Sequence, residues 1–160
     1  MIRVLFVCLG NICRSPTAEG VFRELVRREG LSAEIATDSC GTSDWHIGNP
    51  PDNRACEEAR RRGIDLSDLR ARQVAESDFS DFDYVLGMDA SNIAKLMALC
   101  PPEQHERVRL FLSFAPGVGH DEVPDPYYGG PDGFADVFDM IEAASTGLLD
   151  DIRTRHLGGR

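Results

Sequence analysis

The chain has 160 residues, of which 42% are hydrophobic and 28% charged, and its formal net charge at pH 7 is −10. This composition predicts one globular domain over residues 1–160, and the acidic charge excludes a broad basic surface for nucleic acid or an anionic membrane. No apolar run approaches the roughly 18 residues of a membrane-spanning helix, and the N-terminus lacks a signal-peptide pattern. We therefore expect a cytoplasmic protein, with a monomer as the default state.

The first two predicted elements enclose a short loop. Residues 2–7 are β-forming side chains that stop before Gly10, as a buried parallel strand does. Ser15 followed by Pro16 is typical of a helix start with Ser15 as the N-cap, and the apolar residues that follow keep helical spacing until Gly30. The order strand, tight loop, helix is the first half of a β-α-β unit.

The rest of the chain alternates in the same way. A Gly-, Ser- and Pro-rich loop at residues 40–53 contains Trp45, and residues 157–160 are expected to be a frayed tail. The pattern predicts further strands at residues 34–39, 82–88 and 108–112 and further helices at residues 51–62, 89–99 and 133–155. Alternating strands and helices predict an α/β fold with a parallel sheet.

The loop after the first strand carries the pattern C-x5-R-S, from Cys8 to Arg14 and Ser15. Loops at the carboxyl ends of parallel strands bind ligands, and inward backbone N–H groups at a helix N-terminus favour an anion. Gly10 lets the backbone bend, Asn11 tolerates left-handed dihedrals, and Arg14 offers a planar fork to two phosphate oxygens. We predict a phosphate-binding loop that also contains Leu9, Ile12, Cys13 and Ser15.

Cys8 stands at the mouth of this loop, where a thiolate is well placed to act as a nucleophile. The helix N-terminus and Arg14 favour its negative charge, and Ser15 can donate a hydrogen bond to the sulfur. In-line attack on phosphorus would give a phosphocysteine that water then hydrolyses. The alternative for Cys8 is a buried, inert thiol at a strand end.

The segment from Val7 to Gly20, VCLGNICRSPTAEG, resembles the N-terminal signature of the low-molecular-weight protein tyrosine phosphatases. Three later segments, T-D-S ending at Ser39, S-D-W ending at Trp45 and D-P-Y-Y-G starting at Asp125, match that family in order and separation. The resemblance covers essentially the whole chain. It implies a three-layer flavodoxin-like fold with four parallel strands in the order 2-1-3-4, and a phosphoryl-enzyme mechanism without metal or cofactor.

Chemistry alone does not choose a general acid among Asp121, Asp125 and Asp132, and the resemblance selects Asp125. The resemblance further implies a substrate cleft walled by Trp45, Tyr127 and Tyr128 and a loop supported by Ser39, Asn11 and Asn92. The alternative for Trp45 is a loop anchor buried in the core. Members of the eukaryotic type often have a His near residues 70–72 that supports the loop Asn; this chain has none there, and its replacement stays open.

Five cysteines in a chain expected in a reducing compartment argue against a structural disulfide framework, and their spacing does not suit a zinc site. Cys13 is either a small apolar residue behind the loop or a redox partner of Cys8. A loop curled around one phosphate brings its ends close, so we expect the Cα atoms of Cys8 and Cys13 to approach the separation that a disulfide requires. The family resemblance agrees, since relatives with this second cysteine use it as a reversible protector.

Three alternatives compete with a tyrosine phosphatase. Arsenate reductases share the fold but need closely spaced relay cysteines, whereas Cys40, Cys56 and Cys100 are isolated. Phosphoarginine phosphatases favour Thr where this chain has Ile12, and a non-catalytic phosphate-binding module would lack one of Cys8, Arg14 and Asp125. The cleft implies a tyrosine-phosphorylated protein as partner, with a cognate tyrosine kinase among the candidates.

Overall fold

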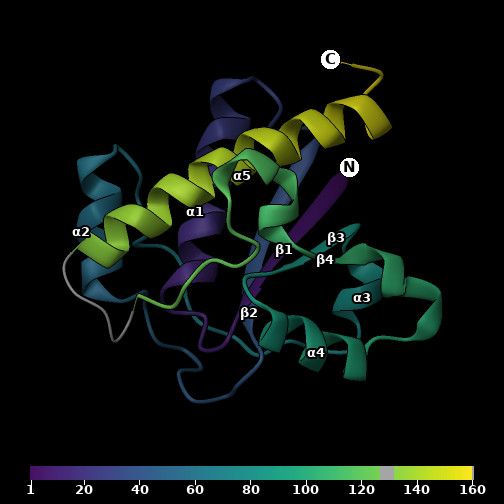
Figure 1. Cartoon of the computed structure of the whole chain (residues 1–160), viewed down its shortest axis with the longest axis horizontal. Coiled ribbons are helices and arrows are strands. Elements are labelled where there is room, and N and C mark those ends of the chain that lie inside the picture. The colour runs from purple at the N-terminus through teal and green to yellow at the C-terminus, as the bar shows by residue number, and fades with distance from the viewer. Residues whose placement is uncertain (127–131, 160) are drawn as a thin grey trace.

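A computed structural model of the chain describes residues 1–126 and 132–159 and contains one four-stranded parallel sheet (Figure 1). The strand order β2-β1-β3-β4 confirms the predicted order and α/β class. The strands are β1 (Ile2–Cys8), β2 (Ile35–Gly41), β3 (Tyr84–Gly87) and β4 (Val108–Leu110).

Helices cover both faces of the sheet, which gives three layers (Figure 1). Buried hydrophobic side chains form two core clusters, one on each face of the sheet. The larger cluster includes residues of α1 (Arg14–Arg28), α2 (Asn53–Arg61) and α5 (Asp132–His156), and the smaller one includes residues of α3 (Asp78–Asp81) and α4 (Ala90–Leu99). Successive side chains of a strand point to opposite faces, and the central strand β1 shows this directly. Val4 and Phe6 join the larger cluster, and Leu5 and Val7 join the smaller one, all fully buried.

Several boundaries differ from the prediction. The fourth strand ends at Leu110 because the chain turns into the 3-10 helix η2 (Phe111–Phe114), whose first two residues stay buried. The helix predicted from residue 51 starts at Asn53, since Asp52 accepts the N–H of Arg54 as its N-cap. Leu157 packs into the core and is not part of a frayed tail. The prediction also missed α3 and the 3-10 helices η1 (Pro102–Arg107) and η3 (Pro116–Val118).

The strand order places the loop after β1 at the switch point of the sheet. β1 lies between β2 and β3, so Cys8 pairs with Gly41, and Val7 pairs with Gly87. The carboxyl ends of β1 and β3 lie at the same edge of the sheet. From there the chain runs from β1 toward β2 on one side and from β3 toward β4 on the other, which opens a crevice suited to a ligand. Residues 9–13 and the segment after β3 both lie at this edge.

Candidate active site

The loop from β1 to α1 curls around the side chain of Cys8. The Sγ atom accepts a hydrogen bond from the backbone N–H of Asn11 at 3.2 Å and lies 3.0 Å from Oγ of Ser15. Asn11 has a φ of 56°, so it adopts the left-handed conformation that the sequence predicted for it. Donors that converge on one sulfur stabilise negative charge there, which suits a nucleophile.

Two glycines allow neighbouring parts of the chain to pack closely against this loop. A Cβ atom on Gly41 would lie 2.8 Å from the carbonyl oxygen of Leu9, so a larger residue would push the loop away from β2. A Cβ on Gly10 would lie 2.9 Å from Cδ2 of His46. Gly10 is not among the described residues with positive φ. The chain nevertheless bends at Gly10, as predicted, and the lack of a side chain there also makes room for His46.

Ser15 is not the helix N-cap. Helix α1 begins at Arg14, the N-cap position belongs to Cys13, and no side-chain capping bond is present there. Ser15 lies inside the first turn, fully buried, and its hydroxyl contacts Cys8 and accepts a hydrogen bond from Nδ2 of Asn11 at 2.8 Å. The N-cap prediction was wrong because, in the folded loop, the Ser15 hydroxyl bonds to Cys8 and Asn11 and does not cap the helix.

Arg14 is buried beneath the loop and is held by groups from two other segments. One terminal nitrogen donates to Oδ2 of Asp89 at 2.6 Å and to the carbonyl of Val123 at 3.1 Å, and the other lies 3.7 Å from Oδ2 of Asp125. Burial acts to lower the pKa of Arg14, but the charges of Cys8 and Asp89 outweigh it and raise that pKa above the usual value. Arg14 is therefore a fixed, permanent cation next to Cys8.

A cavity of about 210 Å³ opens onto these groups. Trp45 is 70% exposed, so it stands at the cavity mouth and is not a core anchor. Tyr127 and Tyr128, the other predicted cleft residues, lie outside the described residues. The cavity is lined by Cys8, Leu9, Gly10, Ile12, Cys13, Arg14, Trp45, His46 and Asp125.

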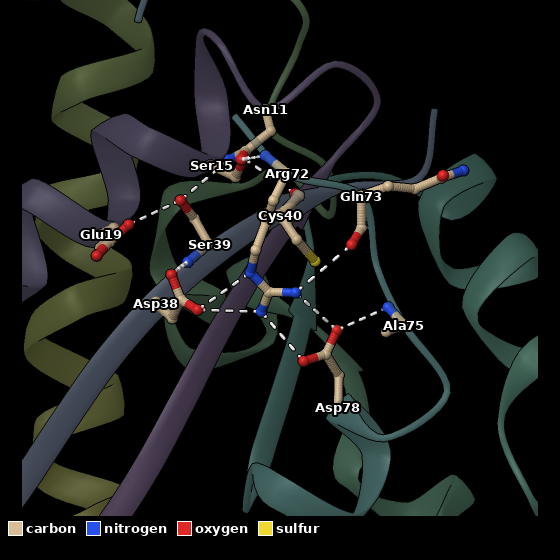
Figure 2. Close-up of polar contacts among 10 residues, drawn as sticks. All are labelled: Asn11, Ser15, Glu19, Asp38, Ser39, Cys40, Arg72, Gln73, Ala75 and Asp78. Atoms are coloured by element: carbon tan, nitrogen blue, oxygen red, sulfur yellow. Dashed lines mark hydrogen bonds and ion pairs between the residues drawn. The ribbon is translucent and has the colours of Figure 1, made fainter. Parts of the chain in front are cut away.

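Behind the loop, Asn11 connects to a chain of buried polar groups (Figure 2). Its Nδ2 donates to Oγ of Ser39 at 3.0 Å as well as to Ser15, and Ser39 in turn donates to Oε1 of Glu19 at 2.7 Å. Burial, only partly offset by the hydrogen bond from Ser39, raises the pKa of Glu19. Ser39 therefore contacts the loop through Asn11, which agrees with a supporting role.

Asn92 supports the site only indirectly. It forms a capping box with Asp89 at the start of α4, in which Asn92 donates its N–H to Asp89 and Oδ1 accepts the N–H groups of Met88 and Asp89. The hydrogen bonds of the described residues join Asn92 to this turn and not to the loop. Asn92 thus holds Asp89, which holds Arg14.

Cys13 lines the same cavity as Cys8, and both are free thiols. Burial, followed by the negative charge of Asp52, raises the pKa of the Cys13 thiol well above its ordinary value. Cys13 is therefore a protonated thiol in the folded loop. Within residues 1–126 and 132–159, no three His, Cys, Asp or Glu side chains gather in a way that could hold a metal ion, and no helix there is long and apolar enough to cross a membrane.

Sequence reasoning missed three residues that the fold brings to the site. Asp89 pairs with Arg14, His46 lines the cavity, and the backbone N–H of Arg72 donates to Oδ1 of Asn11 at 3.0 Å. Asp89 had a usable signal, because it directly follows a strand at the ligand-binding edge of the sheet. His46 adjoins Trp45 in the sequence, whereas a main-chain contact such as that of Arg72 leaves no residue-type signal.

Known proteins match this chain over almost its full length. The family model described as low molecular weight phosphotyrosine protein phosphatase matches residues 3–157. The low molecular weight phosphotyrosine protein phosphatase of Schizosaccharomyces pombe is 48% identical over 153 residues, which are 94% of this chain and 97% of the relative.

Two crystal structures share the fold closely. That of YfkJ from Bacillus subtilis has a TM-score of 0.92 at 43% identity and covers 98% of this chain and 97% of its own. That of a protein tyrosine phosphatase from Entamoeba histolytica, with Hepes in the active site, has a TM-score of 0.92 at 37% identity and covers 99% of both chains.

Proposed function

Because the chain belongs to the low molecular weight phosphotyrosine protein phosphatase family and is thus a protein tyrosine phosphatase, we propose that Cys8 is its nucleophile. The Cys8 sulfur attacks the phosphorus of phosphotyrosine, an S–P bond forms, and the bond from phosphorus to the tyrosyl oxygen breaks. The hydrogen bond from Asn11 and the contact with Ser15 support this role, because they stabilise the thiolate before attack and as the later leaving group.

Arg14 and the loop amides bind the phosphoryl group in this scheme. The guanidinium is fixed by Asp89 and the carbonyl of Val123, so it needs little reorganisation when charge builds up on the phosphoryl oxygens. The inward N–H groups of the loop, at the N-terminus of α1, add positive potential at the same point. No step in this scheme uses a metal or a cofactor.

Asp125 serves as the general acid and then as the general base. Its carboxylic acid gives a proton to the departing tyrosyl oxygen, and its carboxylate next takes a proton from water, whose oxygen attacks the phosphocysteine. The S–P bond breaks, and inorganic phosphate leaves. The support is positional, since Asp125 lines the same cavity as Cys8 and lies 3.7 Å from Arg14.

The walls of the cavity favour an aryl phosphate. Trp45 offers an exposed ring at the mouth, and Ile12 offers an apolar side chain that suits a phenyl ring and gives a guanidinium no hydrogen-bond acceptor. We therefore propose phosphotyrosine over phosphoarginine as the substrate, presented by a protein such as a cognate tyrosine kinase. We also propose that residues 1–160 act as one cytoplasmic phosphatase domain and as a monomer.

The placement of Cys8, Arg14 and Asp125 around one cavity carries this proposal. Purified protein should hydrolyse p-nitrophenyl phosphate in EDTA, with phosphate and vanadate as competitive inhibitors. Cys8→Ser should leave only the background rate, while Cys56→Ser, a thiol that is not among the cavity residues, should behave as the parent. An active Cys8→Ser variant would show that another group is the nucleophile.

A further inference from the structure

The orientation of the Asn11 side-chain amide depends on one backbone group of a distant segment. A backbone N–H can only donate, so the N–H of Arg72, 3.0 Å from the Asn11 side chain, requires an oxygen there. That oxygen is Oδ1, and the NH2 group of the amide must then face the hydroxyls of Ser15 and Ser39 (Figure 2). Both N–H groups and the carbonyl oxygen of the amide are therefore engaged within the protein.

This orientation determines the direction of the hydrogen bond at Cys8. Since Asn11 donates to Oγ of Ser15, the hydroxyl acts as acceptor toward Asn11, and its single proton is left for another partner. The candidates are Sγ of Cys8 at 3.0 Å and the carbonyl of Cys40 at 3.3 Å. A hydrogen bond to a charged sulfur is the stronger of the two, so Ser15 donates to Cys8 when that residue is a thiolate.

The backbone of Arg72 is held against the end of β2. Its carbonyl accepts the N–H of Gly41 at 2.8 Å, and the carbonyl of Gly41 accepts the N–H of Val74 at 2.8 Å. Gly41 also forms an isolated parallel bridge with Gln73. The neighbouring Ala71 donates its N–H to the carbonyl of Asn49 at 2.9 Å and accepts the N–H of Gly48 at 2.8 Å, but these partners lie in the loop between β2 and α2. Among these main-chain contacts β2 is the only strand or helix that holds the segment, so a further anchor to a second element matters.

The side chain of Arg72 supplies that anchor by joining two carboxylates (Figure 2). Its terminal nitrogens donate to both oxygens of Asp78 in α3, at 3.0 and 3.1 Å, and Asp38 in β2 lies 3.0 Å away on another side of the guanidinium. Asp78 is buried and also accepts the N–H of Ala75 at 2.8 Å. A bidentate pair with a buried carboxylate has fixed geometry, unlike an exposed ion pair.

The pKa of Arg72 agrees with this assignment. Burial acts to lower the pKa of the guanidinium, but the hydrogen bonds to Asp78 and the charges of nearby groups that include Asp38 raise it well above its usual value. Arg72 is therefore a charged guanidinium in the folded protein. We call Arg72, Asp38 and Asp78 the Arg72 clasp.

We propose that Arg72 is a positioning residue for the nucleophile: the Arg72 clasp holds the Arg72 N–H on Asn11, and Asn11 thereby directs the Ser15 proton to Cys8. This inference rests on the proposed role of Cys8. It extends that role to a segment more than sixty residues away in the chain, through contacts of 3.0 Å at Asn11 and 2.8 Å at Ser15. Figure 2 shows the continuous set of hydrogen bonds from Asp78 to Ser15.

The test compares Arg72→Gln with the control Arg70→Gln, which removes an exposed arginine whose side chain donates only to the carbonyls of Ser67 and Leu69 among the described contacts. Arg72→Gln should lower kcat for p-nitrophenyl phosphate by about tenfold, the loss of part of a charge-assisted hydrogen bond. The midpoint pH for alkylation of Cys8 by iodoacetamide should rise by about one unit, the pH equivalent of that loss. Arg70→Gln should match the parent in both measurements.

Two further variants extend the test, and the first of them keeps it valid if Arg72→Gln folds poorly. Asp38→Asn changes a side chain that is 45% exposed and keeps its shape, so the variant should fold and show a smaller shift in the same direction. The double variant Arg72→Gln with Asp78→Asn should lose no more activity than Arg72→Gln alone, because both changes open one clasp.

A lower melting temperature with an unchanged kcat and alkylation profile in these variants would overturn the inference and leave the clasp a stabilising contact only. That result differs from a failure of the proposed function, in which Cys8→Ser would keep its activity. If Cys8→Ser is inactive and the Arg72 and Asp38 variants behave as the parent, the positioning role alone is refuted.

Discussion

Replacing Asp89 by Asn separates two roles that this carboxylate holds in the structure. Asp89 caps α4 by accepting the N–H of Asn92 at 2.8 Å, and it holds Arg14 with a contact of 2.6 Å. Asn is among the best N-cap residues, so the helix cap survives in Asp89→Asn. The negative charge that holds Arg14 does not.

The expected loss follows from the contact that disappears. A hydrogen bond to a charged group contributes about 1.5–3 kcal/mol, and Asp89 is 24% exposed at its side chain, so little of this is screened by water. Arg14 keeps the carbonyl of Val123 and Asp125 as partners and is free to turn toward the latter. We expect kcat/KM for p-nitrophenyl phosphate to fall by about 10- to 100-fold, with weaker inhibition by phosphate.

Stability separates the two roles. Asp89→Ala removes the cap as well as the charge, so it should unfold more easily than Asp89→Asn by about 1 kcal/mol in urea titrations. Asp150→Asn, which neutralises an exposed acid of α5, controls for the change in net charge. If Asp89→Asn retains full kcat/KM and full phosphate inhibition, Asp89 is a helix cap only and Arg14 does not depend on it.

Three other variants test the remaining groups. Asp125→Asn should lower kcat by about 10²–10⁴ for poor leaving groups and much less for p-nitrophenol, whereas a uniform loss would mark Asp125 as structural. Peroxide should inactivate the enzyme, and dithiothreitol should restore its activity. Cys13→Ser should keep most of its activity before treatment but regain little of it when dithiothreitol follows peroxide. A Cys8–Cys13 link should appear by mass spectrometry, and equal recovery of the variant would disprove protection. Since burial raises the pKa of Glu19, protonation of this residue favours the folded state, and stability falls as pH rises through the folded pKa. Glu19→Gln should therefore be more stable than the parent at neutral pH and equal to it in acid; a difference that persists in acid would mean that another cause dominates.

Local sequence patterns were sufficient to predict those structural features whose physical cause lies within a few neighbouring residues. The apolar run of β1, the helical spacing after Pro16 and the left-handed tolerance of Asn11 act over a few neighbouring residues, and the structure shows each of them. The C-x5-R-S pattern likewise places Cys8 and Arg14 on one loop, because strand, loop and helix follow each other without interruption. The resemblance to a known family supplied the strand order and the choice of Asp125.

The tertiary structure alone decided which distant groups hold this loop. Asp89 meets Arg14 across 75 residues, and the backbone of Arg72 meets Asn11 across 61 residues, so neither contact follows from spacing along the chain. Ser15 illustrates the same point, because its local preference for an N-cap gave way to Cys8 and Asn11 once the loop closed. Buried polar groups must find partners wherever the packed sheet provides them, and those partners are determined by three-dimensional position.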